Sequence, residues 1–267
     1  ADIPLTQNVL TAPDGNIYAM PNFNGCFHCT LSQKAWINQT WLDRLGLAMP
    51  TTTEELHNVL VAFKDSDANG NGDPSDEIPM IGTNGWHGGV EGFLMAPYAL
   101  STGKATPRLS IVDGVISCNA ITDNFKEGLK TIAQWYADGL IDPEAFSMTT
   151  DLAMTLTGNP NGNRVGLFPA GHPGVCVDLG SAVKDEFVIL PPLKNGEGVS
   201  RTPLFASYPT PRAVITSTCK NPEVAFVWLD AMLDGTLENM MTYWRPDPAF
   251  RMAEPGEVGL NGEPATN

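Results

Sequence analysis

The sequence predicts an α/β fold. Short apolar runs with the character of buried strands alternate irregularly with segments whose apolar residues recur at helical spacing. Of the 267 residues 42% are hydrophobic, and 26 glycines and 22 prolines indicate many turns between elements. The chain is therefore long enough for one large domain or two lobes, and we find no internal repeat in it.

The first predicted elements are a strand and two helices. A short strand is expected at 17–20 and a helix at 38–45, which Gly46 would end. A second helix starts within residues 50–55, where a Thr cap with a Glu three residues later has the pattern of a capping box. Its apolar side chains follow at helical spacing and are Leu56, Val59, Leu60 and Phe63.

Two further helices are expected later in the chain. One starts at Thr122 and closes at Gly139, and the other opens with Asn221 as its cap and Pro222 at its first position. The predicted core faces are Phe125, Leu129, Ile132 and Tyr136 on the first, and Ala225, Trp228, Leu229, Met232 and Leu233 on the second. Strands are expected at 78–81, 165–168, 187–190 and 213–216, and an extended tail from Trp244 onward.

The charge balance narrows the classes of partner. The formal net charge of −15 disfavours nucleic acid and anionic membrane surfaces. No apolar run reaches the ~18 residues that a membrane span needs. The chain opens with Ala1 and Asp2, without an initiator methionine or a signal peptide, so we expect a mature form or a piece of something longer.

Five cysteines leave the redox state of the chain open. Cys26 and Cys29 form a CxxC pair that encloses His28 and follows a loop-like segment. Three interpretations remain, with structural or incidental thiols favoured over a local disulfide and over a metal or redox site. The other cysteines are scattered and are Cys118, Cys176 and Cys219.

An acidic, Asn- and Gly-rich loop at 65–77 is the most specific local signal. Its oxygen-bearing side chains fall at nearly every second position with glycines between them, which suits Ca²⁺ because that ion takes 6–8 hard oxygen ligands. The candidate ligands are Asp65, Asp67, Asn69, Asn71, Asp73, Asp76 and Glu77. The sequence therefore predicts a structural Ca²⁺ site rather than a plain solvated turn.

Two registers of this loop compete. With Asp65 first, Gly70 takes the required glycine position and Asp76 the twelfth. With Asp67 first, two asparagines and the Asp73 carbonyl follow, and Asp76 or Glu77 closes the site.

These same segments carry a family resemblance. The chain resembles extracellular solute-binding protein family 1, and within it the calcium-containing branch that binds alginate oligosaccharides. The resemblance covers roughly residues 12–243. The matching segments are 42–47, 50–52, 67–72, 76–79, 121–129, 136–144, 214–216 and 219–223.

The resemblance implies a type-2 periplasmic-binding-protein fold, with two lobes, a hinge and a ligand cleft between the lobes. It implies that the chain is truncated and holds mainly the second lobe and the return segment of the first. The expected divisions are an inter-lobe strand and connection at 1–24, the second lobe at 25–180, the return segment at 181–243 and the tail at 244–267.

The function that the resemblance implies is the non-catalytic receptor of an ABC importer that captures an oligosaccharide or a related carbohydrate. Such a receptor works outside the cytoplasm, as a secreted or cell-surface lipoprotein of a bacterium. Its partners are the carbohydrate and the transporter permease, without nucleic acid, and it meets the membrane only through a lipid anchor on an absent N-terminal segment.

Candidate ligand contacts are aromatic and planar polar side chains in loops that follow strands, where sugars stack and form hydrogen bonds. Packing is the competing role for each of them. These candidates are Trp86, His87, His172, Asn22, Phe23 and Asn24, together with Tyr208, which lies before the strand expected at 213–216. Other tryptophans are expected in the core, namely Trp41, Trp135 and Trp228, and Trp36 is expected to be buried.

Two other function classes compete with this one. A secreted carbohydrate-active enzyme needs two carboxylates that face each other across a cleft, yet most acids lie in the 65–77 loop or on helix faces. GxSxG, HExxH, phosphate-loop and GxGxxG motifs are absent from the sequence. A calcium-dependent interaction module of the dockerin type needs two tandem loops, and this chain has one.

Overall fold

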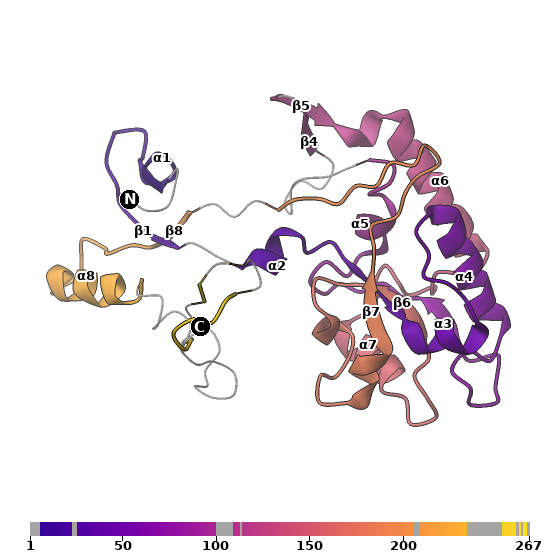
Figure 1. Ribbon diagram of the computed structural model, residues 1–267. Coiled ribbons are helices and arrows are strands. Elements are labelled where there is room, and N and C mark those ends of the chain that lie inside the picture. Colours follow the sequence, from indigo (N-terminus) through magenta and orange to yellow (C-terminus); the bar gives the residue numbers. More distant parts are fainter. Residues whose placement is uncertain are drawn as a thin grey trace. The chain divides into compact units, whose positions relative to one another are not determined.

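The computed structural model describes residues 6–22, 26–99, 109–112, 114–205, 209–233, 253–259, 262 and 264–265. The chain divides into two compact units, Cys26–Ala206 and the pair Ala1–Gly25 with Ser207–Asn267 (Figure 1). The larger unit thus continues past residue 180, where the sequence analysis placed a boundary. Each unit is described separately below.

A four-stranded sheet forms the centre of the larger unit. Its strand order is β3-β6-β2-β7, with β2 antiparallel to both of its neighbours and β3 parallel to β6. Ala35 at the start of β2 lies opposite Pro169 and Leu190, so the ends of β6 and β7 meet there. The strands are β2 (Ala35–Asn38), β3 (Ile78–Met80), β6 (Val165–Pro169) and β7 (Phe187–Leu190), and the last three confirm the expected strands.

Helices α3 (Gln39–Leu45) and α4 (Thr53–Asp65) confirm the first two predicted helices. Gly46 ends α3 at φ 66°, a left-handed conformation that favours glycine. The Thr52 side chain and Glu55 form the expected capping box, which satisfies backbone N–H groups that the first turn leaves without partners.

Helix α6 (Asp123–Ala137) starts where the sequence predicts, with Thr122 as its N-cap, but buries a different face. Leu129 and Tyr136 are each 43% exposed, so their assignment to the core was wrong. Gly128 lies on the buried side instead, because a Cβ there would come within 2.5 Å of the Met95 sulfur. The buried residues of α6 are Phe125, Gly128, Ile132 and Trp135.

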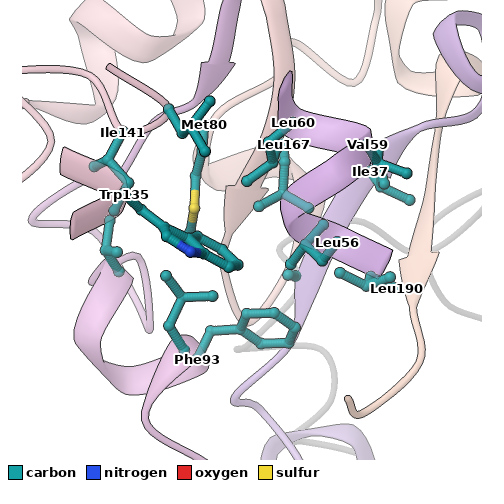
Figure 2. Packing of buried hydrophobic residues seen from close by; sticks show 14 of the residues in the cluster. Ile37, Leu56, Val59, Leu60, Met80, Phe93, Trp135, Ile141, Leu167 and Leu190 are labelled. Carbon is teal, nitrogen blue, oxygen red and sulfur yellow. The ribbon is translucent and has the colours of Figure 1, made fainter. Parts of the chain in front are cut away.

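Both faces of the sheet are covered. Alternate residues along the strands enter different clusters, so that Ile37 and Leu167 pack with one cluster while Phe168 packs with the other. The first cluster gathers around Trp135 and Met80 between the sheet and helices α4, α5 and α6 (Figure 2). The second lies on the side of α7 and includes a T-shaped contact of Phe168 with Phe187, with 4.8 Å between ring centroids.

Trp36 was expected before a helix and buried. It lies in strand β2 instead and is half-buried, with its Nε1 donating to the Ala170 carbonyl at 3.0 Å.

The remaining elements of the larger unit are short. Other elements are α2 (Phe27–Thr30), α5 (Val90–Leu94), the β4 (Leu109–Val112) and β5 (Val115–Cys118) hairpin, η1 (Asn119–Ile121), α7 (Thr150–Thr157), η2 (Pro173–Val175) and η3 (Ala182–Glu186).

In its described residues, the smaller unit contains two helices and a two-stranded sheet. Strand β1 (Met20–Asn22) pairs antiparallel with β8 (Thr210–Ala213), so both strands lie a few residues from the expected 17–20 and 213–216. The helices are α1 (Thr6–Leu10) and α8 (Pro222–Ala231). The tail from Trp244 lies mostly outside the described residues.

Helix α8 begins at Pro222 as predicted, but its expected core face is wrong for this structure. Trp228 is 66% exposed, and none of the residues of α8 is buried. Helical spacing predicts only which side chains share a face, and burial also needs a second surface. The described part of this small unit offers no such surface to α8.

Candidate functional site

One end of the sheet in the larger unit gathers the loops that carry the candidate ligand contacts. The loop after β3 holds Trp86 and His87, the loop after β6 holds His172, and the segment that enters β2 holds His28. Because β3 runs parallel to β6 and β2 runs antiparallel to it, these three segments meet at the same end of the sheet. In α/β proteins, ligands bind at this end, beyond the carboxyl ends of parallel strands.

The aromatic and imidazole rings at this end form a continuous cluster, which we call the aromatic edge. His28 contacts Trp86 edge-on with 5.8 Å between ring centroids, and His172 lies 6.3 Å from His28. His87 lies 5.4 Å from Trp86 and 4.8 Å from Phe205 by the same measure. The aromatic edge therefore consists of His28, Trp86, His87, His172 and Phe205.

Gly171 lets the loop after β6 lie directly against the Trp86 indole. Its backbone N–H donates to the Trp86 carbonyl at 2.9 Å, and a Cβ at this position would come within 2.6 Å of Trp86 Cε3. The indole is therefore held between its own loop and the loop after β6. Trp86 as a whole is half-buried.

His87 is fixed in an uncommon backbone conformation. Its φ is 56°, in the left-handed region that non-glycine residues seldom adopt. The Gln33 amide holds it from the segment before β2, because Gln33 Nε2 donates to the His87 carbonyl at 3.4 Å and Gln33 Oε1 lies 3.2 Å from His87 Nδ1. Backbone strain of this kind often marks a functional site.

Lys34 places a positive charge next to the backbone of His28 and Gly171. Lys34 Nζ donates to the carbonyls of His28 at 3.4 Å and Gly171 at 3.5 Å, and burial lowers its pKa. The pKa of His28 is also lowered, first by burial and then by the charges of Lys34 and His172. Both shifts follow from the desolvation of cations that crowd at one place.

A hollow of about 160 Å³ adjoins these residues. Gln33 and Lys34 belong to its lining, together with Ile189, which is 50% exposed although β7 was expected to be a buried strand. Its wall combines aliphatic surface with hydrogen-bond donors, the combination that small-molecule sites use. Further lining residues are Leu31, Pro97, Pro192, Leu193, Arg201 and Thr202.

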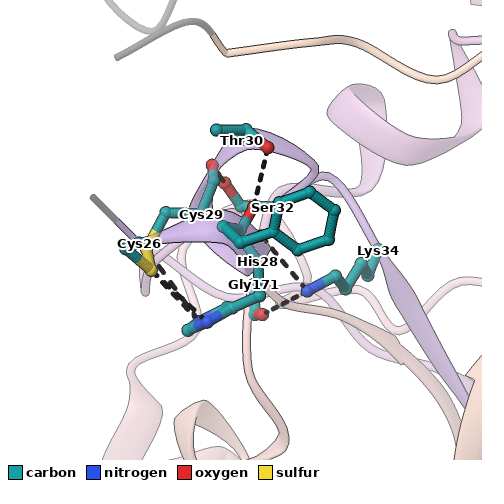
Figure 3. The surroundings of a disulfide bond; sticks show 8 residues. Cys26, His28, Cys29, Thr30, Ser32, Lys34 and Gly171 are labelled. Carbon is teal, nitrogen blue, oxygen red and sulfur yellow. Dashed lines mark hydrogen bonds between the residues drawn. A yellow bond between two sulfur atoms is a disulfide. The ribbon is translucent and has the colours of Figure 1, made fainter. Parts of the chain in front are cut away.

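The CxxC pair is a disulfide in this structure. Cys26 and Cys29 are bonded across the turn of α2, with the His28 ring beside both sulfur atoms (Figure 3). Of the three interpretations left open by the sequence, the local disulfide is the one that the structure contains. The remaining thiols are free, with Cys176 buried and Cys118 and Cys219 partly exposed.

The structure brings together some of the proposed ligand contacts and adds others. Trp86, His87 and His172 share the aromatic edge, whereas Asn22 lies in β1 of the smaller unit. Phe23, Asn24 and Tyr208 lie outside the described residues. His28, Gln33, Lys34 and Phe205 were not among the expected ligand contacts, and the sequence offered no signal for the first three because strand β2, which they precede, was not predicted.

The acidic loop folds around its own carboxylates. The Asn69 and Asn71 side-chain amides donate to the two oxygens of Asp76 at 3.0 and 3.1 Å. The backbone N–H of Asn69 donates to Glu77 Oε1, and that of Gly72 donates to Asp67 Oδ2. The loop therefore gathers Asp67, Asn69, Asn71, Asp76 and Glu77.

Two carboxylate oxygens in this loop are buried without a partner among the described residues. They are Asp67 Oδ1 and Glu77 Oε2. Burial raises the pKa of Glu77, and the nearby Asp76 charge adds to the effect while the Asn69 N–H partly offsets it. Unpaired buried oxygens beside amide oxygens are a donor set that fits Ca²⁺.

The backbone of the loop is held from outside by two arginines. Arg44 donates to the Ala68 carbonyl, and Arg164 Nε donates to the Asp76 carbonyl at 2.9 Å. Asp65 is the last residue of α4, and Asp73 Oδ1 accepts from the Ser75 hydroxyl and N–H, which lowers the Asp73 pKa. This arrangement favours the register with Asp67 first, where position 73 contributes its carbonyl.

The α/β fold matches part of the periplasmic-binding-protein-like fold of solute-binding proteins. Structure comparison agrees, and the chain is a homologue of the extracellular solute-binding proteins of ABC transporters over about half of their length. No family model matches the sequence.

The most informative relative is the fructooligosaccharide ABC transporter substrate-binding protein FusA of Streptococcus pneumoniae serotype 4. It is 34% identical over 251 residues, which are 90% of this chain and 44% of FusA. FusA in complex with kestose matches with a TM-score of 0.76 at 29% identity, over 97% of this chain and 54% of that one. A FusA EF-hand mutant in complex with fructo-nystose matches equally well.

Two further solved structures show the same fold. The HMO-binding solute-binding protein of Bifidobacterium longum infantis has a TM-score of 0.73 at 25% identity, over 89% of this chain and 49% of that one. Alginate-binding protein AlgQ2, solved without calcium ion, has a TM-score of 0.66 at 23% identity, over 99% of this chain and 52% of its own. The chain thus spans about half the length of the relatives that it matches.

Proposed function

We propose that the chain is the solute-binding receptor part of an ABC importer and that it captures an oligosaccharide. The observation that carries the proposal is the 34% identity to a fructooligosaccharide-binding protein over 90% of this chain. The aromatic edge supports it, because it places the half-buried Trp86 among imidazole rings, and an indole suits the C–H face of a sugar ring.

Polar groups around the indole would select and orient the sugar. Imidazole nitrogens of His28 and His172 and the donors of Lys34 and Arg201 lie around the rings and the hollow, where they can bind hydroxyl oxygens. Such groups bind without a covalent step. The function proposed here is accordingly capture of a solute and not its chemical conversion.

The acidic loop is proposed as a structural Ca²⁺ site. Asp67, Asn69, Asn71, Asp76 and Glu77 would supply oxygens to the ion, and the ion would remove the cost of the two unpaired buried oxygens. One matching structure is an EF-hand mutant of FusA, so this relative has an EF-hand, and that supports the assignment. The loop lies between α4 and β3, so its role would be to clamp that connection.

The setting of this receptor is also a proposal. Its partners would be the carbohydrate and the permease of the transporter, and its place would be outside the cytoplasm of a bacterium, held to the membrane by a lipid anchor. None of the helices in the described part of the chain is long and apolar enough to cross a membrane.

The experiment is a titration with oligosaccharides in the presence of Ca²⁺. Kestose, a milk oligosaccharide and an alginate oligosaccharide should be compared by calorimetry, and at least one should bind saturably without being cleaved. Trp86→Ala should weaken that binding by roughly 1–3 kcal/mol, the scale at which an aromatic anchor contributes. If Trp86→Ala bound the sugar with unchanged affinity, the indole would not be part of the binding site.

A matched control keeps that result interpretable. Phe146 is 62% exposed and contacts only Tyr136 among the ring pairs of the described chain, so Phe146→Ala removes an aromatic ring away from the aromatic edge. Its affinity should equal that of the unmodified chain. Turnover of any of the sugars, abolished by one carboxylate substitution, would contradict the receptor assignment.

A further inference from the structure

The turn of α2 brings three metal-ligating atoms together. Cys26 is the N-cap of α2 and Cys29 lies within its single turn, and the disulfide joins their two sulfur atoms. His28 Nδ1 lies 3.3 Å from Cys26 Sγ, and His28 Nε2 lies 3.9 Å from each sulfur. One ligand atom from each of the three residues falls within 4.8 Å of the others (Figure 3).

The chemistry of these atoms is distinct from that of the acidic loop. Thiolate sulfur and imidazole nitrogen are the ligands that Zn²⁺ prefers, whereas Ca²⁺ takes oxygen. In the disulfide the two sulfur atoms are bonded to each other and are not available as thiolates. Metal binding at this turn and the disulfide are therefore mutually exclusive states of the same two residues.

We propose that Cys26, His28 and Cys29 form a redox-gated site for a thiophilic divalent cation of the Zn²⁺ type. A dithiol reduces the Cys26–Cys29 disulfide by thiol–disulfide exchange. The two cysteines gain two electrons and two protons, and the dithiol becomes a disulfide. The cation then replaces the two thiol protons and binds the two thiolates and the neutral imidazole. A disulfide oxidant reverses both steps and releases the ion.

The surroundings of the turn suit this role. Lys34 Nζ binds the His28 carbonyl and holds the turn against the loop after β6, since it also binds the Gly171 carbonyl. Its positive charge opposes a cation, but the two thiolates carry enough negative charge to neutralise a divalent ion. His172 lies on a separate element, with 6.3 Å between its ring centroid and that of His28.

The experiment uses Co²⁺ as a probe for this site. The chain is reduced with a phosphine, which takes up oxygen from water as the disulfide becomes two thiols, and Ca²⁺ is added first to saturate oxygen-rich sites. Co²⁺ should then produce the intense near-ultraviolet charge-transfer absorption of cobalt bound to thiolate, at a stoichiometry of one. Zn²⁺ should abolish it by displacement.

Variants identify the ligands. Cys26→Ser and Cys29→Ser should each lose the absorption. His28→Ala should weaken Co²⁺ binding by at least roughly 10- to 100-fold, because loss of even an outer-shell partner of a metal site has an effect of that size. The double variant Cys118→Ser/Cys219→Ser removes the two partly exposed free thiols and should bind Co²⁺ like the unmodified chain. Melting curves establish that each variant is folded.

Three results would overturn the proposal. The first is the absence of the absorption from reduced, folded chain in which thiol titration shows Cys26 and Cys29 to be free. The second is an equal absorption from the oxidised chain, in which no thiolate is available at this turn. The third is survival of the absorption in Cys29→Ser together with its loss in the Cys118→Ser/Cys219→Ser control.

Discussion

At the aromatic edge, a single missing methyl group decides how close two loops can come. Gly171 lies so near the Trp86 ring that any side chain there must displace either the ring or the loop after β6. The Lys34 ammonium binds the carbonyl of the same glycine, so the loop has little freedom to retreat. The position of the indole is therefore determined by a residue that itself carries no functional group.

Gly171→Ala should accordingly shift the Trp86 ring and weaken sugar binding. Overpacking of this kind costs about 1–3 kcal/mol of folding stability, which urea unfolding can measure. Gly196→Ala is the matched control, because nothing lies within 4 Å of a Cβ at that exposed glycine. Equal stability and equal sugar affinity of the two variants would show that the contact with the indole is not close.

Of the three free thiols, Cys176 is buried, whereas Cys118 and Cys219 are partly exposed. Burial raises the pKa of the Cys176 thiol to about 12, from an ordinary value of 9.0, while the Thr83 hydroxyl offsets part of the rise. The thiol is therefore protonated in the folded chain at all ordinary pH values. Its contribution to stability is present below pH 9 and is lost as the pH rises from 9 towards 12, because the unfolded chain ionises there and the folded chain does not.

Iodoacetamide at pH 8 should therefore alkylate Cys118 and Cys219 in the folded chain and Cys176 only after unfolding. Peptide mass spectrometry of folded and denatured samples measures each site. Labelling of Cys176 in the folded chain as rapid as that of Cys219 would mean that the second core cluster is open to solvent.

At the level of elements, the local signals in the sequence were sufficient for caps and for strands β3, β6 and β7, but not for β2 at the centre of the sheet. The Thr52 capping box, Gly46 at the end of α3 and the fully buried β6 follow from residues that are neighbours in the sequence. The burial of Gly128 in place of Leu129 could not be predicted, because it depends on Met95, more than thirty residues away. The Cys26–Cys29 bond was likewise only one of three possibilities, since spacing alone does not decide the state of a CxxC pair.

The proposed Ca²⁺ site makes the stability of the acidic loop depend on the ion. Calcium should raise the melting temperature of the chain, since a ligand at 100 times its Kd adds about 2.7 kcal/mol to the free energy of unfolding. Asp67→Asn should remove this response, because it takes the negative charge from a residue whose Oδ1 is buried without a partner in the described chain. Calorimetry with calcium and with a chelator measures both.

Asp65→Asn is the control for that experiment, since Asp65 ends α4 and takes no part in the hydrogen bonds that gather the loop. Its calcium response should be kept. An unmodified chain that melts at the same temperature with calcium and with chelator, after verified metal removal, would exclude the site. Loss of the response in Asp65→Asn alone would favour the other register.

At the level of the whole molecule, the fold class and the solute-binding relationship were both predictable, because the segments that carry the resemblance are continuous in the sequence. The composition of the aromatic edge was only half predictable. Trp86, His87 and His172 could be found as aromatic residues after strands, but His28 and Phe205 join them only when β2 pairs with β6 and when Phe205 N–H binds the Thr30 carbonyl at 2.7 Å.

The measurement that tests the central claim most directly is a nuclear magnetic resonance titration of the tryptophan indole N–H signals with kestose. The chain has six tryptophans, so each signal can be assigned by single substitution, beginning with Trp86→Phe. Weak binding is visible at millimolar sugar because fast exchange still moves the signal. The account predicts that the Trp86 signal shifts saturably while the signals of the core residues Trp41 and Trp135 stay in place. A Trp86 signal that does not move, for kestose and for the other oligosaccharides alike, would contradict the assignment of the aromatic edge as a sugar-binding site.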